Sequence, residues 1–174
     1  MSKDPPGFVC DFMLGRLARY LRTLGLDTLY VRQSTPEVLL PLAHGRILLT
    51  RKRALLALRS QGIQVYLVPS EKTDEQLRWV IETFRPPLRP FTRCALCNTP
   101  LVHKTREEAK GRVPYYTWRT QAIFSYCPRC DKFYWGGTHK DAMVRRFRRI
   151  LGHLWPEDPS QAVVNTVELD SQEP

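Results

Sequence analysis

A chain of 174 residues is long enough for one medium-sized domain, or for a domain with a small added module, and it can bury a sizeable core. Its formal charge of +10 is unevenly distributed, because residues 155–174 contain five acids and no Lys or Arg, which leaves 27 basic against 12 acidic side chains, or +15, in the rest of the chain. Charge of one sign on this scale attracts polyanions, of which nucleic acid is the commonest. The alternative is a solvated basic surface that serves only solubility.

No apolar run approaches the length of a membrane span, and the first residues, Met1–Pro6, lack the apolar segment of a secretory signal. We therefore expect a cytoplasmic protein without membrane contact. Thiols stay reduced in that compartment, and four of the five cysteines form two C-x-x-C pairs. This arrangement favours a bound metal over disulfides.

Between residues 7 and 86, apolar segments alternate with amphipathic segments, as strands alternate with helices. We predict strands over residues 8–10, 27–31, 46–50 and 64–68. We predict helices over residues 13–23, 35–44, 52–59 and 73–84, the last opened by a capping box of Thr73 and Gln76. The alternation predicts a parallel sheet covered on both faces. The fold class is therefore α/β, a three-layer α/β/α domain over residues 7–86.

A proline-rich linker at residues 85–90 separates this domain from a second unit at residues 91–154. Cysteines, aromatic residues and basic residues come first in this unit, and an amphipathic C-terminal helix with a basic side follows over residues 138–151. We expect its segment 104–119 to form a hairpin or loop. Residues 155–174 are acidic and poorly periodic, which predicts a disordered tail.

The two cysteine pairs have the composition of a structural zinc site. Four thiolates complete the tetrahedral coordination that zinc prefers and leave no position for water. The predicted zinc ligands are Cys94, Cys97, Cys127 and Cys130. Such a site contributes on the order of 10–16 kcal/mol of binding free energy to folding, so we expect zinc loss to unfold residues 91–137 and to leave the sheet domain largely folded. The alternative is free thiols or a redox pair.

Aromatic and basic residues alternate around the cysteines. They are Tyr115, Tyr116, Trp118, Arg119, Arg129, Lys132, Phe133, Tyr134 and Trp135. Aromatic rings stack on unpaired bases while cations contact phosphates, so this unit is a candidate RNA-binding surface. The alternative is that the aromatic side chains form the small core of the zinc ribbon.

Two carboxylates are expected at one rim of the predicted sheet. Asp11 ends the first strand and Glu37 lies in the first turn of the second helix. Carboxylates bind Mg²⁺ or Mn²⁺, which activates water for attack on a phosphodiester. The alternative roles are a helix cap for Asp11 and a helix-dipole partner for Glu37.

Several motifs resemble one known family. Residues 8–27 read F-V-x-D-x-M-L-G-R-L-A-R-x-L-R-x-L-G-x-D, residues 45–51 read G-R-I-L-L-T-R, Gln76 precedes Leu77, and residues 134–139 read Y-W-x-G-x-H. With the cysteine pairs, they resemble the Mut-seven C-terminal RNase family, a branch of the PIN-like nucleases, over residues 8–152. The resemblance implies a PIN-like domain fused to a zinc ribbon, with metal-dependent RNA cleavage.

The resemblance also assigns site residues. Asp11 matches the family's first acid, and Glu37 falls in the acid-rich start of the second helix, although Ser34 and Thr35 replace acids that often precede it. After the fourth strand an acid is usual, and Glu71 or Asp74 is the candidate.

Lys52 departs from the family pattern, which usually has an aspartate after Thr50-Arg51. A cation here repels the divalent ion that a carboxylate would attract. Three interpretations follow. The site is inactive in hydrolysis and kept for binding, or it holds one metal through the remaining acids, or Lys52 itself contacts the scissile phosphate.

The sequence therefore leaves three candidate functions. The first is a PIN-like, Mg²⁺- or Mn²⁺-dependent ribonuclease, degenerate if Lys52 disables it. The second is a non-catalytic RNA-binding zinc-ribbon protein. The third is a protein-interaction module whose basic face meets an acidic partner. Because PIN-like domains often pair, the resemblance also allows a homodimer.

Overall fold

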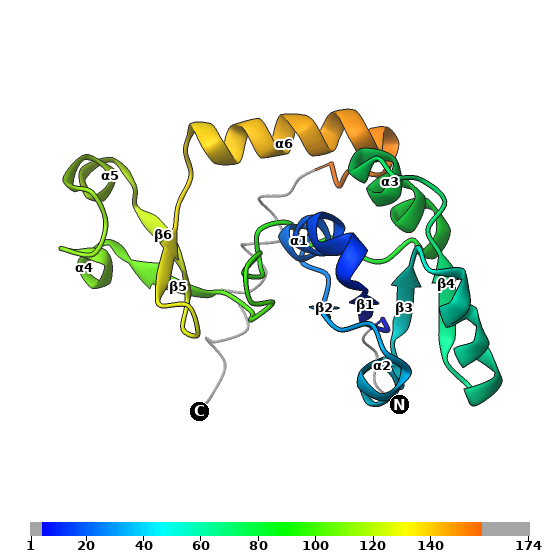
Figure 1. Cartoon of the computed structure of the whole chain (residues 1–174). Helices are drawn as coiled ribbons and strands as arrows, with labels where there is room; N and C mark the ends of the chain where they lie inside the picture. The colour runs from blue at the N-terminus through cyan, green and yellow to red at the C-terminus, as the bar shows by residue number, and fades with distance from the viewer. Residues whose placement is uncertain (1–4, 158–174) are drawn as a thin grey trace, which may run out of the picture.

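The computed structural model describes residues 5–157 and has a four-stranded parallel sheet at its centre (Figure 1). Its strands are β1 (Phe8–Cys10), β2 (Thr28–Tyr30), β3 (Ile47–Thr50) and β4 (Gln64–Leu67), in the order β2-β1-β3-β4. All residues of β1 and β3, the two central strands, are buried. This burial explains why these strands are continuously apolar rather than alternating, since both faces of the sheet are covered.

Helices cover both faces, as the α/β/α prediction requires. One face carries α1 (Gly15–Thr23), α3 (Thr73–Phe84) and α6 (Thr138–Leu151), whose apolar side chains share one core with Phe8 and Cys10 of β1. The other carries α2 (Pro36–Ala43) and the 3₁₀ segment η2 (Arg53–Gln61), which share a second core with Val9. Successive residues of β1 thus point to opposite cores, as the pleat of a strand dictates.

Three local predictions are corrected. The first predicted helix is divided into a 3₁₀ turn, η1 (Phe12–Leu14), and α1, and the helix expected over residues 52–59 is the 3₁₀ segment η2. The capping box is also wrong, because Thr73 is the first residue of α3 rather than its cap. Ser70 acts at this end instead: its Oγ accepts from the Lys72 amide and donates to Glu75, and its carbonyl accepts from Gln76.

The second unit contains a three-stranded antiparallel sheet, seen to the left in Figure 1. It consists of β5 (Val102–Thr105), β6 (Ile123–Cys127) and β7 (Lys132–Tyr134). The segment predicted as a hairpin or loop instead contains two short helices, α4 (Arg106–Ala109) and α5 (Tyr115–Thr120). A true capping box, formed by Thr105 and Glu108, begins α4.

The C-terminal helix α6 returns from this unit to the sheet domain and crosses above α1 and α3 (Figure 1). Phe147 and Leu151 are fully buried there, and the ring of Trp155 stacks on Phe147 at a centroid distance of 6.0 Å. The tail prediction is therefore wrong for Trp155, while its residues 158–174 lie outside the described part. Within residues 5–157, no helix is both long and apolar enough to cross a bilayer.

The linker after α3 lies along the C-terminal end of α1. The Arg89 amide donates to the Leu24 carbonyl, and the Phe91 amide donates to the Thr23 carbonyl. Gly25 makes this approach possible, because its φ of +83° favours glycine and a Cβ atom there would lie 2.1 Å from the Arg89 carbonyl oxygen. The sheet domain and the second unit are thus in contact at backbone level.

We expect Gly25→Ala to lower the free energy of unfolding by about 2–4 kcal/mol, because the added methyl group meets backbone that cannot move aside. Gly45→Ala is the matched control: Gly45 has φ +72° but no atom within 4 Å of the added Cβ. The control should lose about 1 kcal/mol, from backbone strain alone. Urea denaturation of both variants measures the difference, and equal losses would contradict the packing argument.

Candidate functional site

The structure brings the two cysteine pairs together. The Sγ atoms of Cys94, Cys97, Cys127 and Cys130 all lie within 4.8 Å of one another. The long gap between the pairs is filled by β5, α4, α5 and β6, and β6 ends at Cys127. Four converging sulfurs are the donor set of a closed tetrahedral zinc site, so the residues present fit a structural zinc ion.

Neighbouring polar groups orient the thiols. Thr99 Oγ1 lies 3.2 Å from Cys97 Sγ, and Tyr134 Oη lies 3.2 Å from Cys94 Sγ. Burial opposes ionisation of Cys97, but hydrogen bonds with the hydroxyl and the amide of Thr99 outweigh it and lower the pKa of this thiol to about 6. Zinc binds the thiolate, which suits Cys97, whereas burial raises the pKa of Cys127 and the hydrogen bond with Cys97 raises the pKa of Cys130. No motif in the sequence indicates the role of Thr99, and Tyr134, a candidate RNA contact by its sequence, has its hydroxyl at the cysteines.

A buried arginine connects the zinc loop to the sheet domain. Arg22, at the end of α1, is only 8% exposed. Its Nε donates to the Thr28 carbonyl at 2.8 Å, and its Nη1 donates to the carbonyls of Leu96 at 2.9 Å and Ala95 at 3.3 Å, the two residues between Cys94 and Cys97. A buried guanidinium is tolerated only when such acceptors satisfy it. The position of the first cysteine pair is therefore tied to α1 and β2.

A second set of contacts reinforces this connection. Asn98, directly after Cys97, donates its Nδ2 to Asp27 Oδ1 at 2.7 Å and accepts the Thr28 amide at its Oδ1 at 3.0 Å. Asp27 also pairs with Arg46 at 2.8 Å. Burial opposes ionisation of Asp27, but the hydrogen bonds from Arg46 and Asn98 outweigh it and lower the pKa of its carboxyl group. The zinc loop and the edge strand β2 thus form one polar network.

At the carboxyl end of the parallel sheet, Asp11 has a structural role. Its side chain is fully buried, with Oδ1 accepting the Met13 amide at 2.9 Å and Oδ2 accepting the Thr50 hydroxyl. Asp11 is thereby the N-cap of η1. Asp11 thus has the helix-cap role that is the alternative to metal binding, and its hydrogen bond with Thr50 links the ends of β1 and β3.

Lys52 lies beside this carboxylate network. Its backbone amide donates to Thr50 Oγ1 at 2.9 Å, so Thr50 bridges Asp11 and Lys52. The Lys52 ammonium lies 4.6 Å from the centre of the exposed Phe12 ring, a cation–π contact. In the described part of the chain, no carboxylate pairs with Lys52.

Glu37 is exposed and engaged at the start of its own helix. Its own backbone amide and the Thr35 hydroxyl lower the pKa of its carboxyl group, as expected for a helix-dipole partner. The residue of this segment that reaches the end of β1 is Ser34, whose Oγ accepts the Phe12 amide at 3.2 Å. Ser34 lies in the segment where the family resemblance predicts an acid, and the structure has a hydroxyl group there.

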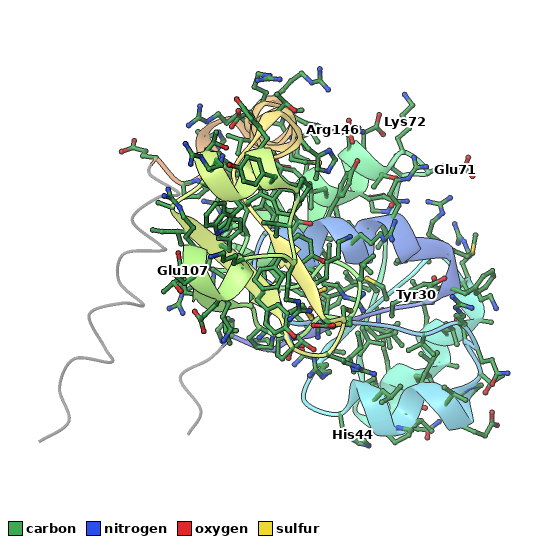
Figure 2. The ribbon with its side chains drawn as sticks, turned by 90° about the vertical axis from the view of Figure 1, so that its left-hand side faces the viewer. Tyr30, His44, Glu71, Lys72, Glu107 and Arg146 are labelled. Carbon is green, nitrogen blue, oxygen red and sulfur yellow. The ribbon has the colours of Figure 1, made fainter. Side chains whose placement is uncertain are left out.

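The remaining candidate acids pair with arginines. Glu71, 88% exposed at the periphery of the molecule (Figure 2), contacts Arg51 Nη2 at 3.2 Å. Asp74 contacts Arg146 Nη2 of α6 at 2.8 Å. Within the described residues, the four cysteines are the one group of three or more potential metal ligands, so the candidate carboxylates do not gather as a metal-binding cluster.

Comparison with known proteins identifies the family of the chain. A family model described as the Mut7-C RNAse domain matches residues 6–147. The chain belongs to the Mut7-C RNAse domain family. Neither curated proteins nor solved structures gave a match. A Mut7-C RNAse domain indicates a nuclease-type function, with RNA as substrate or partner.

The Arg22 contacts change the expected effect of zinc loss on this Mut7-C domain. We expect chelation of zinc to unfold residues 91–137 and also to speed hydrogen exchange in α1 and β2, because Arg22 and Asn98 lose a fixed loop. Hydrogen-exchange mass spectrometry with and without chelator measures this, with α2 as the internal control. Unchanged exchange in α1 and β2 would show that the sheet domain is independent of zinc.

Replacing Arg22 tests the same connection from the other side. Arg22→Met leaves three carbonyls without their donor, so we expect a loss of about 2–4 kcal/mol in unfolding free energy and weaker zinc retention against a competing chelator. Arg19→Met, an exposed position on the same helix, is the control and should change stability by less than about 0.5 kcal/mol. Equal behaviour of the two variants would refute the coupling.

Proposed function

We propose that this protein binds RNA at the carboxyl end of its four-stranded sheet, and that its Mut7-C RNAse domain has lost efficient metal-dependent hydrolysis. The observation that carries the proposal is the position of Lys52. It lies two residues after the end of β3, shares Thr50 with the buried Asp11, and directs its ammonium over the exposed Phe12 ring. A cation and an exposed aromatic ring at this rim suit a nucleotide better than a divalent ion.

The residues at the rim do not fit the Mg²⁺ or Mn²⁺ that the family implies. Both oxygens of Asp11 already accept hydrogen bonds in a fully buried position. Glu71 and Asp74 are paired with arginines, and Ser34 presents a hydroxyl. Divalent ions need several carboxylate oxygens that converge on one point. The rim therefore supports phosphate binding rather than a hydrolytic step through such an ion.

Charge at the rim supports RNA binding. Besides Lys52, three exposed arginines follow the ends of the strands in sequence: Arg16 after β1, Arg32 after β2 and Arg53 after β3. Parallel strands present their carboxyl ends at a single edge, so these cations share that edge. Contacts of lysine and arginine with phosphates provide most of the affinity of proteins for nucleic acids and make it dependent on salt.

Residual metal-dependent RNA hydrolysis is the second candidate. Family membership favours it, as does the place of Asp11, which follows β1 where the family's first acid is expected. A lysine that contacts the scissile phosphate would be compatible with such activity. The two candidates differ in one measurable property, which is cleavage of RNA in the presence of Mn²⁺.

We expect Lys52→Glu to weaken RNA binding about tenfold and to reduce the dependence of log Kd on log salt by about one unit, because one phosphate contact is lost. Arg78→Glu makes the same charge change on α3, away from the strand ends, and should have a smaller effect. Fluorescence anisotropy with labelled RNA across a salt series gives both quantities. Equal effects of the two variants would contradict binding at the rim.

A cleavage assay with the same proteins distinguishes the two candidate functions. Wild-type protein incubated with RNA and Mn²⁺ should leave the RNA intact, and Lys52→Asp, which restores the family's acid, should increase Mn²⁺-dependent cleavage. If wild type cleaves the RNA and Lys52→Asp does not increase this cleavage, the hydrolase is favoured and the proposed loss of hydrolytic activity is refuted. Absence of RNA binding at about 50 mM salt would refute both candidates.

A further inference from the structure

The short helix α5 carries two of the most exposed aromatic side chains in the described part of the chain. Tyr115 is 72% exposed and Tyr116 is 78% exposed, and α5 has no buried residue. Figure 1 places α4 and α5 at the end of the molecule far from the parallel sheet. Large apolar rings in such a position cost solvation free energy without contributing to a core, so they indicate a surface that meets a partner.

The aromatic residues of the zinc ribbon divide into two groups with different surroundings. Phe124 and Phe133 form the small core with Ala109, and the Tyr134 hydroxyl contacts Cys94. Tyr115 and Tyr116 take part in neither arrangement. The interpretation of these aromatic residues as a ribbon core thus applies to the first group, and the pair on α5 is the part left to bind a partner.

Hydrogen bonds with α4 hold α5 in place. The Trp118 indole N–H donates to the Arg106 carbonyl at 3.0 Å, and Arg106 Nε donates to the Gln121 carbonyl at 3.1 Å, so α4 is tied to both α5 and the residue that ends it. The Tyr115 ring lies 5.9 Å from the Trp118 ring. A partner therefore meets a helix and a Tyr115 ring that are already positioned, which reduces the conformational entropy lost on binding.

The surroundings of these rings are cationic. Residues 102–137 contain seven basic and three acidic side chains. Lys110 lies 5.6 Å above the Trp118 ring, and Arg119 is exposed on α5 itself. Two of the three acids are already engaged, Glu108 with Lys104 and Asp131 with Arg112. Exposed rings beside unneutralised cations match bases joined by phosphates, and they match an apolar protein surface poorly.

We propose that Tyr115 and Tyr116 form a stacking platform for unpaired bases of single-stranded RNA, with Lys110 and Arg119 beside the phosphates. The proposal rests on the proposed function and deepens it by naming the class of RNA. Base faces are free to stack in a single strand and hidden in a duplex. The platform therefore selects single-stranded RNA, while Lys52 at the rim supplies a phosphate contact that does not depend on the bases.

The test uses the full-length, zinc-loaded protein and a fluorescent, unstructured RNA of about 12 nucleotides, free or annealed to its complement. We expect the double variant Tyr115→Ala/Tyr116→Ala to bind the single strand at least about tenfold more weakly and the duplex less than about twofold more weakly. Its salt dependence should stay at the wild-type value, because the cations remain. Tyr115→Phe/Tyr116→Phe retains the rings and should bind like wild type.

Two controls keep the result interpretable. Leu42→Ala removes a 38% exposed apolar side chain from α2 and should leave RNA affinity unchanged. Zinc content and the circular dichroism spectrum of the tyrosine variants should equal those of wild type, because neither ring is buried. If the alanine variant fails this check, the proposal is tested with the phenylalanine variant and by crosslinking RNA that contains 4-thiouridine to the wild-type protein. We expect crosslinked adducts on the peptide that contains residues 115–118.

The outcomes also separate this inference from the proposed function. If wild type binds no RNA, the proposed function fails. Suppose that wild type binds RNA and that Lys52→Glu weakens this binding. If the tyrosine-to-alanine double variant then binds single-stranded RNA normally, or loses affinity equally for single strands and duplex, only the stacking platform is refuted. If sedimentation shows that wild type is a dimer and the alanine variant is a monomer, the rings contact a second copy of the chain, and the proposal is overturned.

Discussion

The contact between Arg22 and the loop of the first cysteine pair determines how the two parts of this chain are arranged. A guanidinium buried at the end of α1 requires acceptors, and it finds them in the β2 carbonyl of Thr28 and in the carbonyls of Ala95 and Leu96. Those carbonyls are in place only if the loop keeps its shape, which four thiolates around a zinc ion would fix. The zinc site therefore stabilises more than the ribbon, since it also completes the polar network at the edge of the parallel sheet.

The rim of the sheet illustrates how a nuclease scaffold changes when individual charges change. Asp11 is retained and still connects β1 to β3 through Thr50, so its structural contribution does not require a metal. Lys52 and Ser34 stand where the family resemblance predicts acids, and Glu71 and Asp74 pair with arginines. Neither Lys52 nor Ser34 contributes negative charge to this edge, and the charges of the two acids are balanced by arginines. On the proposed function, this edge attracts phosphates directly instead of divalent cations.

Much of the fold could be predicted from the sequence because its signals are local. Apolar runs such as Ile47–Thr50 identify buried strands, and two C-x-x-C pairs identify a metal site whatever lies between them. Errors arose where distant residues decide. The partner of Asp74 is Arg146, which lies 72 positions away, and Trp155 is buried only because Phe147 returns to the sheet. The capping box predicted for α3 was wrong for a local reason: Lys72 occupies the N-cap position, and its amide donates to the Ser70 hydroxyl.

The antiparallel ribbon is attached to the sheet domain at both of its ends, through the linker that pairs with Leu24 and through α6, which packs into the core. A module held by two connections keeps a set distance and orientation relative to the rest of the protein. On the proposed function, an RNA strand that contacts the ribbon at one point would meet the sheet domain at a high effective concentration, so that two weak contacts would act as one stronger contact. The fixed separation of the two surfaces would then determine the length of RNA strand that can contact both.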